Sequence, residues 1–387
     1  MLNTIGELPS SVLRQPFMRV LHFLDTLGRG GAEMQALDVA RNAAEFGFDL
    51  TVVSAGGGAL EEDFRNSGSE LIRLKRRLPV DPFLAQQIKR IIKERDIEIV
   101  HGYQSVDGIH LYVATLGLKK VRKVLSFQGF IQDQKNLSAA KFLIPRMDAN
   151  IVVSRGLQTW LSENDRLDTS KKFSVIYNGS DPKRLIPTGR SIRAELGMDT
   201  GTPLVGMIAN FYRDRRKDQL SVVKAMVSVL AKIPNVHCVF AGGIETGAEE
   251  KLAACVDLCR ENNISDRVHF IGARNDVPDI LGELDIAIMS SFHEGLPVAI
   301  SEAMLAGTAL IVSDIQPHLE ASQNGEFTEV FPTGDADILA ERICELLNDD
   351  DQRKQLAEKA KSFALENLSI YSHLRDLKKL YESLLAS

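Results

Sequence analysis

The sequence predicts an α/β protein of two doubly wound domains that face each other across a cleft. Short apolar runs alternate with helix-forming segments along almost the whole chain, a pattern typical of parallel sheets covered by helices on both faces. A polar stretch containing several prolines and glycines interrupts this alternation between Asn178 and Pro203. Because 387 residues exceed one ordinary hydrophobic core, the interruption is expected to separate two domains.

The apolar runs place the individual elements. In the first half, strands are expected at residues 18–24, 50–54, 97–101, 121–127 and 149–154, with a helix from the glycine turn at 28–31 to Ala44. In the second half, strands are expected at 204–209, 236–241, 268–271, 284–289 and 309–313, with helices near 219–233, 248–262, 297–306 and from about 335 and 350. The predicted organisation is a flexible leader (1–17), a first domain (18–180), a second domain (181–365) and a C-terminal helix (366–387) that packs back on the first domain.

The composition is that of a globular protein, with 44% hydrophobic and 25% charged residues. No apolar run reaches the roughly 20 residues that a membrane-spanning helix needs, and the first residues lack the features of a signal peptide. The cysteines lack the spacing of a zinc site or a disulfide framework. We therefore expect buried, reduced thiols, no bound metal, and a cytoplasmic location that includes the inner face of the cytoplasmic membrane. The cysteines are Cys238, Cys255, Cys259 and Cys344.

The charge is divided unevenly. Residues 1–180 hold 24 Lys and Arg against 20 Asp and Glu, whereas the remainder hold 22 against 32. The basic residues of the first half cluster at Arg73–Arg77 and Lys119–Lys123. A solvated face is one interpretation, and a surface that meets anionic lipid head groups or an anionic acceptor is the other. Nucleic acid is disfavoured, because no basic stripe is interleaved with aromatic residues.

The most informative segment joins two carboxylates, Glu294 and Glu302, through a Gly-Leu-Pro turn. Glu294 is expected on a loop at the carboxyl end of a strand, and Glu302 one to two turns into the following helix. Open α/β sheets bind ligands at this edge, and the free N–H groups at a helix start favour an anion such as phosphate. Carboxylates repel phosphate, so they are expected to face hydroxyl groups. A solvated surface glutamate is the alternative, but Glu302 interrupts an apolar stretch, where a buried carboxylate needs a partner.

Glycines and basic residues stand at three other strand ends. Gly30 and Gly31 lie between the first strand and the first helix, where small residues let the backbone approach a ligand; a bare tight turn is the alternative. Gly242 and Gly243 end a strand of the second domain and would admit a ligand in the same way. The basic residues follow the first strand of the second domain, and such side chains bind phosphate. They are Arg213, Arg215, Arg216 and Lys217.

In this order and spacing, the motifs resemble glycosyltransferase family 4, whose members are retaining nucleotide-sugar transferases with the GT-B fold. The matching features run from about Met18 to Leu385. They are the Gly30–Glu33 turn, Tyr177–Asp181, Asn210-Phe211 with Lys217, Val268–Gly272, and the pair Glu294 and Glu302.

The resemblance implies a GT-B fold of two Rossmann-like domains and an enzyme that moves a hexosyl group with retention. The donor would be a nucleotide diphosphate sugar, with no further cofactor. The acceptor would be a glycan or a lipid-linked molecule in cell-envelope polysaccharide, lipopolysaccharide or exopolysaccharide biosynthesis. Separately from the resemblance, the two basic clusters predict that the first domain contacts the membrane peripherally through Arg73–Arg77 and Lys119–Lys123.

The resemblance also implies roles for individual residues. Gly30 and Gly31 would contact the diphosphate or the transferred sugar through their backbone. Arg213 and Lys217 would bind the diphosphate and stabilise it as it leaves. Glu294 would hold hydroxyl groups of the donor sugar, together with the backbone N–H groups of Gly295 and Leu296. Glu302 would hold the hydroxyl groups of the ribose. Attack on the front face, with the leaving phosphate accepting the proton, fits the lack of an obvious nucleophile.

Gln128 departs from the family pattern. Many relatives have a His-Gly pair in this region, where the histidine contacts the donor sugar, but this chain has Gln128-Gly129. Glutamine can bond to a hydroxyl group, but it cannot carry a proton as imidazolium does. Two interpretations follow: a transferase with a changed donor or acceptor, or a nucleotide-sugar-binding protein with weak or no catalysis that acts as an assembly partner.

Overall fold

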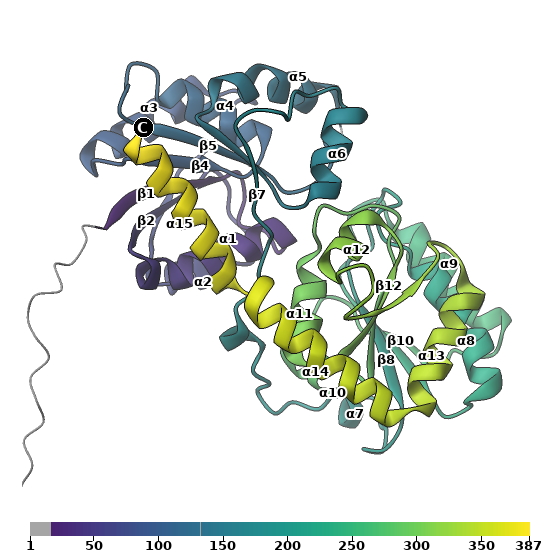
Figure 1. The fold of residues 1–387 in the computed structure, drawn as a ribbon. Helices are drawn as coiled ribbons and strands as arrows, with labels where there is room; N and C mark the ends of the chain where they lie inside the picture. Colours follow the sequence, from purple (N-terminus) through teal and green to yellow (C-terminus); the bar gives the residue numbers. More distant parts are fainter. Residues whose placement is uncertain (1–16, 132) are drawn as a thin grey trace, which may run out of the picture.

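The computed structural model describes residues 17–131 and 133–387, and within them two parallel sheets, each covered by helices, form two domains (Figure 1). The first sheet has the strand order β3-β2-β1-β4-β5-β6-β7, and the second has the order β10-β9-β8-β11-β12-β13. Each pair of neighbouring strands is parallel. The predicted fold of two doubly wound domains is therefore confirmed. The predicted leader at 1–17 lies outside the described residues, except for Phe17.

The first domain contains the seven-stranded sheet. Its strands are β1 (Met18–Leu24), β2 (Phe48–Ser54), β3 (Glu70–Arg73), β4 (Ile99–Gly102), β5 (Arg122–Phe127), β6 (Ala149–Val152) and β7 (Phe173–Val175). Its helices are α1 (Gly31–Asn42), α2 (Glu61–Arg65), α3 (Pro82–Glu94), α4 (Ser105–Ala114), α5 (Gln134–Leu143) and α6 (Arg155–Glu163), with short 3-10 turns η1 (Ala43–Phe46) and η2 (Ile144–Arg146).

The second domain follows the 3-10 turn η3 (Pro182–Leu185). Its strands are β8 (Leu204–Ile208), β9 (His237–Ala241), β10 (Val268–Phe270), β11 (Ile286–Met289), β12 (Ala309–Ser313) and β13 (Glu329–Phe331). Its helices are α7 (Ile192–Glu195), α8 (Gln219–Lys232), α9 (Glu249–Glu261), α10 (Val277–Glu283), α11 (Val298–Ala306), α12 (Gln316–Ala321), α13 (Ala336–Asn348) and α14 (Asp350–Asn367).

The chain crosses between the domains twice, and the two crossings lie side by side. Ser180 on the outgoing crossing pairs with Ser369 on the returning one, through backbone bonds from Ser180 N–H to Leu368 O (3.1 Å) and from Ile370 N–H to Ser180 O (2.9 Å). Gly179 has no room for a side chain, since a Cβ there would lie 2.2 Å from the Ser369 carbonyl oxygen. The two crossings therefore form one narrow connection.

The last helix, α15 (Ile370–Ala386), returns to the first domain, whereas α14 covers the second (Figure 1). Its apolar face joins the core around β1, with Leu374, Leu377 and Tyr381 fully buried. The Tyr381 hydroxyl lies 3.0 Å from His22 Nε2 and 2.6 Å from His101 Nδ1. Core packing and buried hydrogen bonds thus both fix this helix to the first sheet.

Candidate active site

A cavity of about 1180 Å³ lies between the two domains. Its walls are the loops that follow β1, β4 and β5 in the first domain and β8, β9, β10 and β11 in the second. Parallel strands bring their carboxyl ends to one edge of a sheet, so both sheets present these loops to the same space. Every predicted site residue except Arg213 and Arg215 lines this cavity.

Two helices begin at the cavity, and their first residues nearly touch. A Cβ on Gly31, the first residue of α1, would lie 3.7 Å from Val298 Cγ2, the first residue of α11. Helix α11 has no acidic residue in its first turn, whereas α1 carries Glu33 there. Helix α11 ends at Gly307 (φ +82°), as predicted. The sequence predicted Pro297 as its first residue, but Pro297 is its N-cap.

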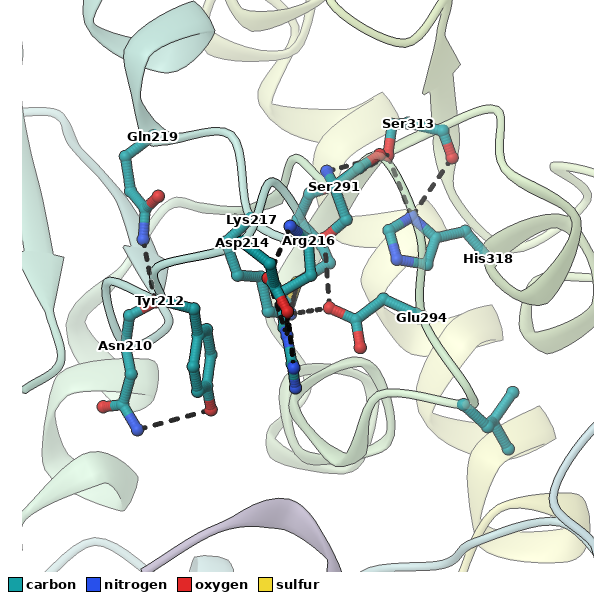
Figure 2. Close-up of polar contacts among 12 residues, drawn as sticks. Asn210, Tyr212, Asp214, Arg216, Lys217, Gln219, Ser291, Glu294, Ser313 and His318 are labelled. Carbon is teal, nitrogen blue, oxygen red and sulfur yellow. Dashed lines mark hydrogen bonds and ion pairs between the residues drawn. The ribbon is translucent and has the colours of Figure 1, made fainter. Parts of the chain in front are cut away.

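The central contact of the site is the ion pair between Lys217 and Glu294 (Figure 2). Lys217 Nζ lies 2.5 Å from Glu294 Oε1, and the two side chains are 9% and 13% exposed. Lys217 Nζ also lies 3.2 Å from Met289 Sδ at the end of β11. A β-bridge from Lys217 to Ser291 joins the loops after β8 and β11. The sequence placed both charged residues in the cleft, and the structure brings them into direct contact.

Buried hydroxyl groups hold the Glu294 loop from behind (Figure 2). Ser291 Oγ lies 3.4 Å from Glu294 Oε1, and Ser313 Oγ donates to the Ser291 carbonyl oxygen at 2.9 Å. His318 Nδ1 lies 3.1 Å from Ser313 Oγ. Burial lowers the pKa of His318 to about 3, and the charge of Lys217 acts in the same direction. The supporting imidazole is therefore neutral at physiological pH.

Arg216, rather than Arg213, reaches the cavity. Arg213 is turned towards Glu245. The Glu245 carboxylate accepts the backbone N–H of Arg213 at 2.8 Å and lies 3.9 Å from Arg213 Nε. The Arg213 side chain is 68% exposed. Arg216 lines the cavity. Its Nε and Nη2 donate to the Asp214 carboxylate at 2.9 Å and 2.6 Å. The Tyr212 ring lies 4.5 Å from its guanidinium carbon. The predicted placement of Arg213 in the cleft is corrected because Glu245 holds the start of this loop outwards.

Glu302 has the buried partner that its apolar surroundings require. Arg184 Nη1, on the 3-10 turn between the domains, lies 2.8 Å from Glu302 Oε1. The same guanidinium binds both oxygens of Asp38 on α1, at 2.9 to 3.3 Å. Burial raises the pKa of Glu302, while Arg184 opposes this shift. Arg184 could not be predicted from the sequence, because its partners are more than 100 positions away.

At Gly295 the backbones of the two domains approach each other closely. A Cβ on Gly295 would lie 2.3 Å from the Gln128 carbonyl oxygen. The Gly295 carbonyl accepts from Ser154 Oγ at 2.8 Å, and Asn178 Nδ2 donates to Gln128 Oε1 at 3.0 Å and to the Leu296 carbonyl at 3.4 Å. Gln128 and the Glu294 loop are thus held against each other across the cleft.

Gly242 also lines the cavity, and its small size has a packing reason. A Cβ there would lie 2.1 Å from the Ala209 carbonyl oxygen.

Within the described residues, no three His, Cys, Asp or Glu side chains form a group suited to a metal ion. No helix in that part of the chain is long and apolar enough to span a membrane. All four cysteines are buried and free.

Two family models match adjacent parts of the chain. "Glycosyltransferase Family 4" matches residues 29–184, and "Glycosyl transferases group 1" matches residues 189–363. The first match includes Gly30, Gly31 and Gln128, and the second includes Lys217, Glu294 and Glu302. Both walls of the cavity therefore lie within matched regions.

Individual relatives agree with these matches. The N,N'-diacetylbacillosaminyl-diphospho-undecaprenol alpha-1,3-N-acetylgalactosaminyltransferase of Campylobacter jejuni is 30% identical over 215 residues, which cover 55% of this chain and 51% of that protein. This chain thus matches about half of that relative's length. The N-acetyl-alpha-D-glucosaminyl L-malate synthase of Bacillus anthracis is 23% identical over 309 residues, or 78% of this chain and 77% of that protein.

Solved structures share the fold. Anabaena HepE, in a complex with UDP and glucose, superposes with a TM-score of 0.83 at 19% identity, over 95% of this chain and all of that one. The two-domain arrangement is the GT-B fold of such glycosyltransferases, which confirms the fold implied by the resemblance.

Proposed function

Because the chain belongs to glycosyltransferase family 4 and is a transferase enzyme, we propose that it moves a hexosyl group from a nucleotide diphosphate sugar to a glycan or lipid-linked acceptor, with retention of configuration. The setting is the assembly of a cell-envelope polysaccharide. The Lys217–Glu294 ion pair carries this proposal, because it places a cation and a hydroxyl-binding carboxylate together at the start of α11 in the cleft. The named substrate of the Campylobacter relative and the UDP and glucose bound by HepE support the same substrate classes.

The diphosphate binds at the start of α11 in this proposal. Free N–H groups and the positive end of the helix dipole attract an anion there. Lys217 has three N–H donors, of which Glu294 takes one and Met289 Sδ another, so one remains for the diphosphate. Arg216 adds a second cation at the cavity wall. Each charge-assisted bond is worth about 1.5–3 kcal/mol. The start of α1 is less suitable for phosphate, because Glu33 lies in its first turn.

The two glutamates bind hydroxyl groups of the donor. Glu294 holds the sugar, assisted by the backbone of Gly295 and Leu296, and Glu302 holds the ribose. Arg184 occupies one oxygen of Glu302, and a carboxylate oxygen can accept further bonds from the ribose. Gly30, Gly31, Gly242 and Gln128 complete the walls around the donor.

In the transfer step, the bond from the anomeric carbon to the diphosphate oxygen breaks, and a bond to the acceptor oxygen forms on the same face. The acceptor proton passes to the leaving phosphate oxygen. Lys217 and Arg216 stabilise the negative charge that develops on the leaving group. Gln128 cannot carry a proton, so its part is limited to hydrogen bonding.

A donor screen followed by a transfer assay tests the proposal. Thermal shifts with uridine, guanosine and adenosine diphosphate sugars identify the donor, because a bound ligand raises the melting temperature. Transfer of the tritium-labelled sugar to a membrane lipid extract should then fall about a hundredfold or more in Lys217→Ala and in Glu294→Ala. Lys224→Ala, an exposed substitution on α8, serves as the control. Full activity in both cleft variants would refute the assignment.

A further inference from the structure

Three large apolar side chains protrude from one surface of the first domain. Leu78 and Val80 lie on the loop between β3 and α3 and are 51% and 54% exposed. Phe83, in the first turn of α3, is 66% exposed. Isolated exposed apolar residues are ordinary, but several within six positions of one another indicate a contact surface.

Cations surround these apolar residues. A hollow of about 570 Å³ beside Phe83 is lined by Lys75, Arg77, Lys89, Arg90 and Lys93. Asp81, which also lines it, is buried and caps α3 by accepting the N–H groups of Phe83 and Leu84. Arg90 lies 3.3 Å from Glu94 on the same helix. We call the three apolar residues and these five cations the α3 face.

The α3 face continues to the end of α4. Lys89 Nζ donates to the Leu116 carbonyl oxygen at 2.5 Å. Leu116 is itself 50% exposed, and Lys119 and Lys120 beyond it are exposed. The exposed apolar residues and positive charge therefore extend from α3 to the segment that follows α4. Helices α3 and α4 are neighbours (Figure 1).

Only some residues of the two basic clusters, Arg73–Arg77 and Lys119–Lys123, are exposed and, within the part of the chain that the structure describes, outside ion pairs, so only these can contact a partner. Arg73 pairs with Glu61 at 2.7 Å, Arg76 with Asp25 at 2.9 Å and Lys123 with Asp148 at 2.7 Å. Lys75, Arg77, Lys119 and Lys120 remain exposed. Lys89, Arg90 and Lys93 of α3 lie outside the two sequence clusters and add positive charge to the α3 face.

We propose that the α3 face docks this protein on a bilayer that contains anionic phospholipid. The cations match the negative head groups of the inner face of a cytoplasmic membrane, and the apolar side chains enter the boundary between head groups and acyl chains. The Leu78–Val80 loop follows β3 at the carboxyl edge of the sheet, which is also the edge that lines the cleft. Docking there brings the cleft close to the lipid surface.

Flotation of the full-length protein with lipid vesicles tests whether the α3 face docks on an anionic bilayer. The assay requires neither donor nor turnover, so its outcome is independent of the proposed reaction. The wild-type protein should float with vesicles of phosphatidylcholine and phosphatidylglycerol, and about tenfold less with phosphatidylcholine alone or at high salt. Lys89→Glu with Lys93→Glu, and separately Leu78→Ser with Phe83→Ser, should each reduce binding to the anionic vesicles about tenfold.

Matched variants on α14 provide the controls. Lys354→Glu with Lys359→Glu makes the same change in net charge on an exposed face of the second domain, and Leu365→Ser removes an apolar side chain that is 46% exposed. Both should bind like the wild type. Equal losses in the α14 and α3 variants, or no binding to anionic vesicles, would overturn the proposal. A protein that stays off vesicles but self-associates through the α3 face would show a protein partner instead and would also overturn it.

Discussion

Arg213 and Arg216 stand three positions apart but lie in different surroundings. The Arg213 side chain points to Glu245 at the outer surface, whereas Arg216 lines the cleft beside Lys217. Asp214 fixes the Arg216 guanidinium with several hydrogen bonds, so the cation is held in place before any ligand arrives. A held cation loses less conformational freedom when it binds phosphate.

We therefore predict that Arg216→Ala lowers kcat/KM for the donor about tenfold or more, while Arg213→Ala changes it less than about twofold. The first substitution removes a charge from the cleft wall, and the second removes one from the exposed surface. Steady-state kinetics with varied donor concentration provide the measurement. Equal losses in the two variants would contradict the assignment of Arg216.

At this scale the sequence predicted the residue types but not all their contacts. Glu294 and Lys217 were placed correctly because each follows a strand, and parallel strands bring their ends together. Arg184 was not predicted, because its contact with Glu302 depends on how the two domains meet. The sequence did not indicate which of Arg213 and Arg216 reaches the cavity, because this depends on the loop after β8, where Arg213 contacts Glu245.

At the scale of elements, α15 contributes both apolar and polar contacts to the first domain. Tyr381 lies between His22 and His101, and His101 Nε2 in turn lies 2.6 Å from Ser126 Oγ. Ser126 precedes Gln128 by two residues on the strand that leads into the cleft. A C-terminal helix is thereby connected, through buried hydrogen bonds, to a strand that ends at the site.

Tyr381→Phe should lower the free energy of unfolding by about 1–3 kcal/mol, because it leaves imidazole nitrogens without a partner in the core. Tyr371→Phe on the same helix, at a half-buried position, should change it by less than about 0.5 kcal/mol. Urea unfolding followed by circular dichroism measures both values. A Tyr381 variant as stable as the wild type would show that the hydroxyl group contributes little.

The strands missed from the sequence are β3, β7 and β13. Each has three or four residues and lies at the edge of its sheet. Their side chains are mostly half-buried, so they lack the continuous apolar run that marked the central strands. Edge position alone does not explain why they were missed, because β10 (Val268–Phe270) is also an edge strand and was predicted.

At the scale of the whole molecule, buried histidines link stability to pH. Burial lowers the pKa of seven histidines, for His22 and His318 to about 3. In the unfolded chain a histidine titrates near pH 6.5. Between these values the unfolded chain binds protons that the folded protein does not, so stability decreases as the pH falls below about 6.5. The seven are His22, His101, His110, His237, His269, His318 and His373.

His22 and His318 should each reduce the free energy of unfolding by up to about 1.4 kcal/mol per pH unit as the pH falls from 6.5 towards 3. The raised pKa values of Asp107 and Glu302 act in the opposite direction and make the net slope smaller. Urea unfolding at pH 7.5 and 5.5 measures the slope, which should be smaller in His318→Gln. An unchanged slope in this variant would show that His318 does not contribute.

The paired crossings between the domains also bear on the order of synthesis. The second domain is an insertion, because the chain leaves the first domain at Ser180 and returns to it at Ser369. The core around β1 includes Leu374, Leu377 and Tyr381. On the ribosome, the first domain therefore emerges first but lacks one side of its core until α15 has been made. The second domain, whose ends meet at the crossing, has its whole sheet by residue 331 and the last helix of its core, α14, by residue 367. Its core is therefore complete in the chain before α15 supplies the missing side of the first domain.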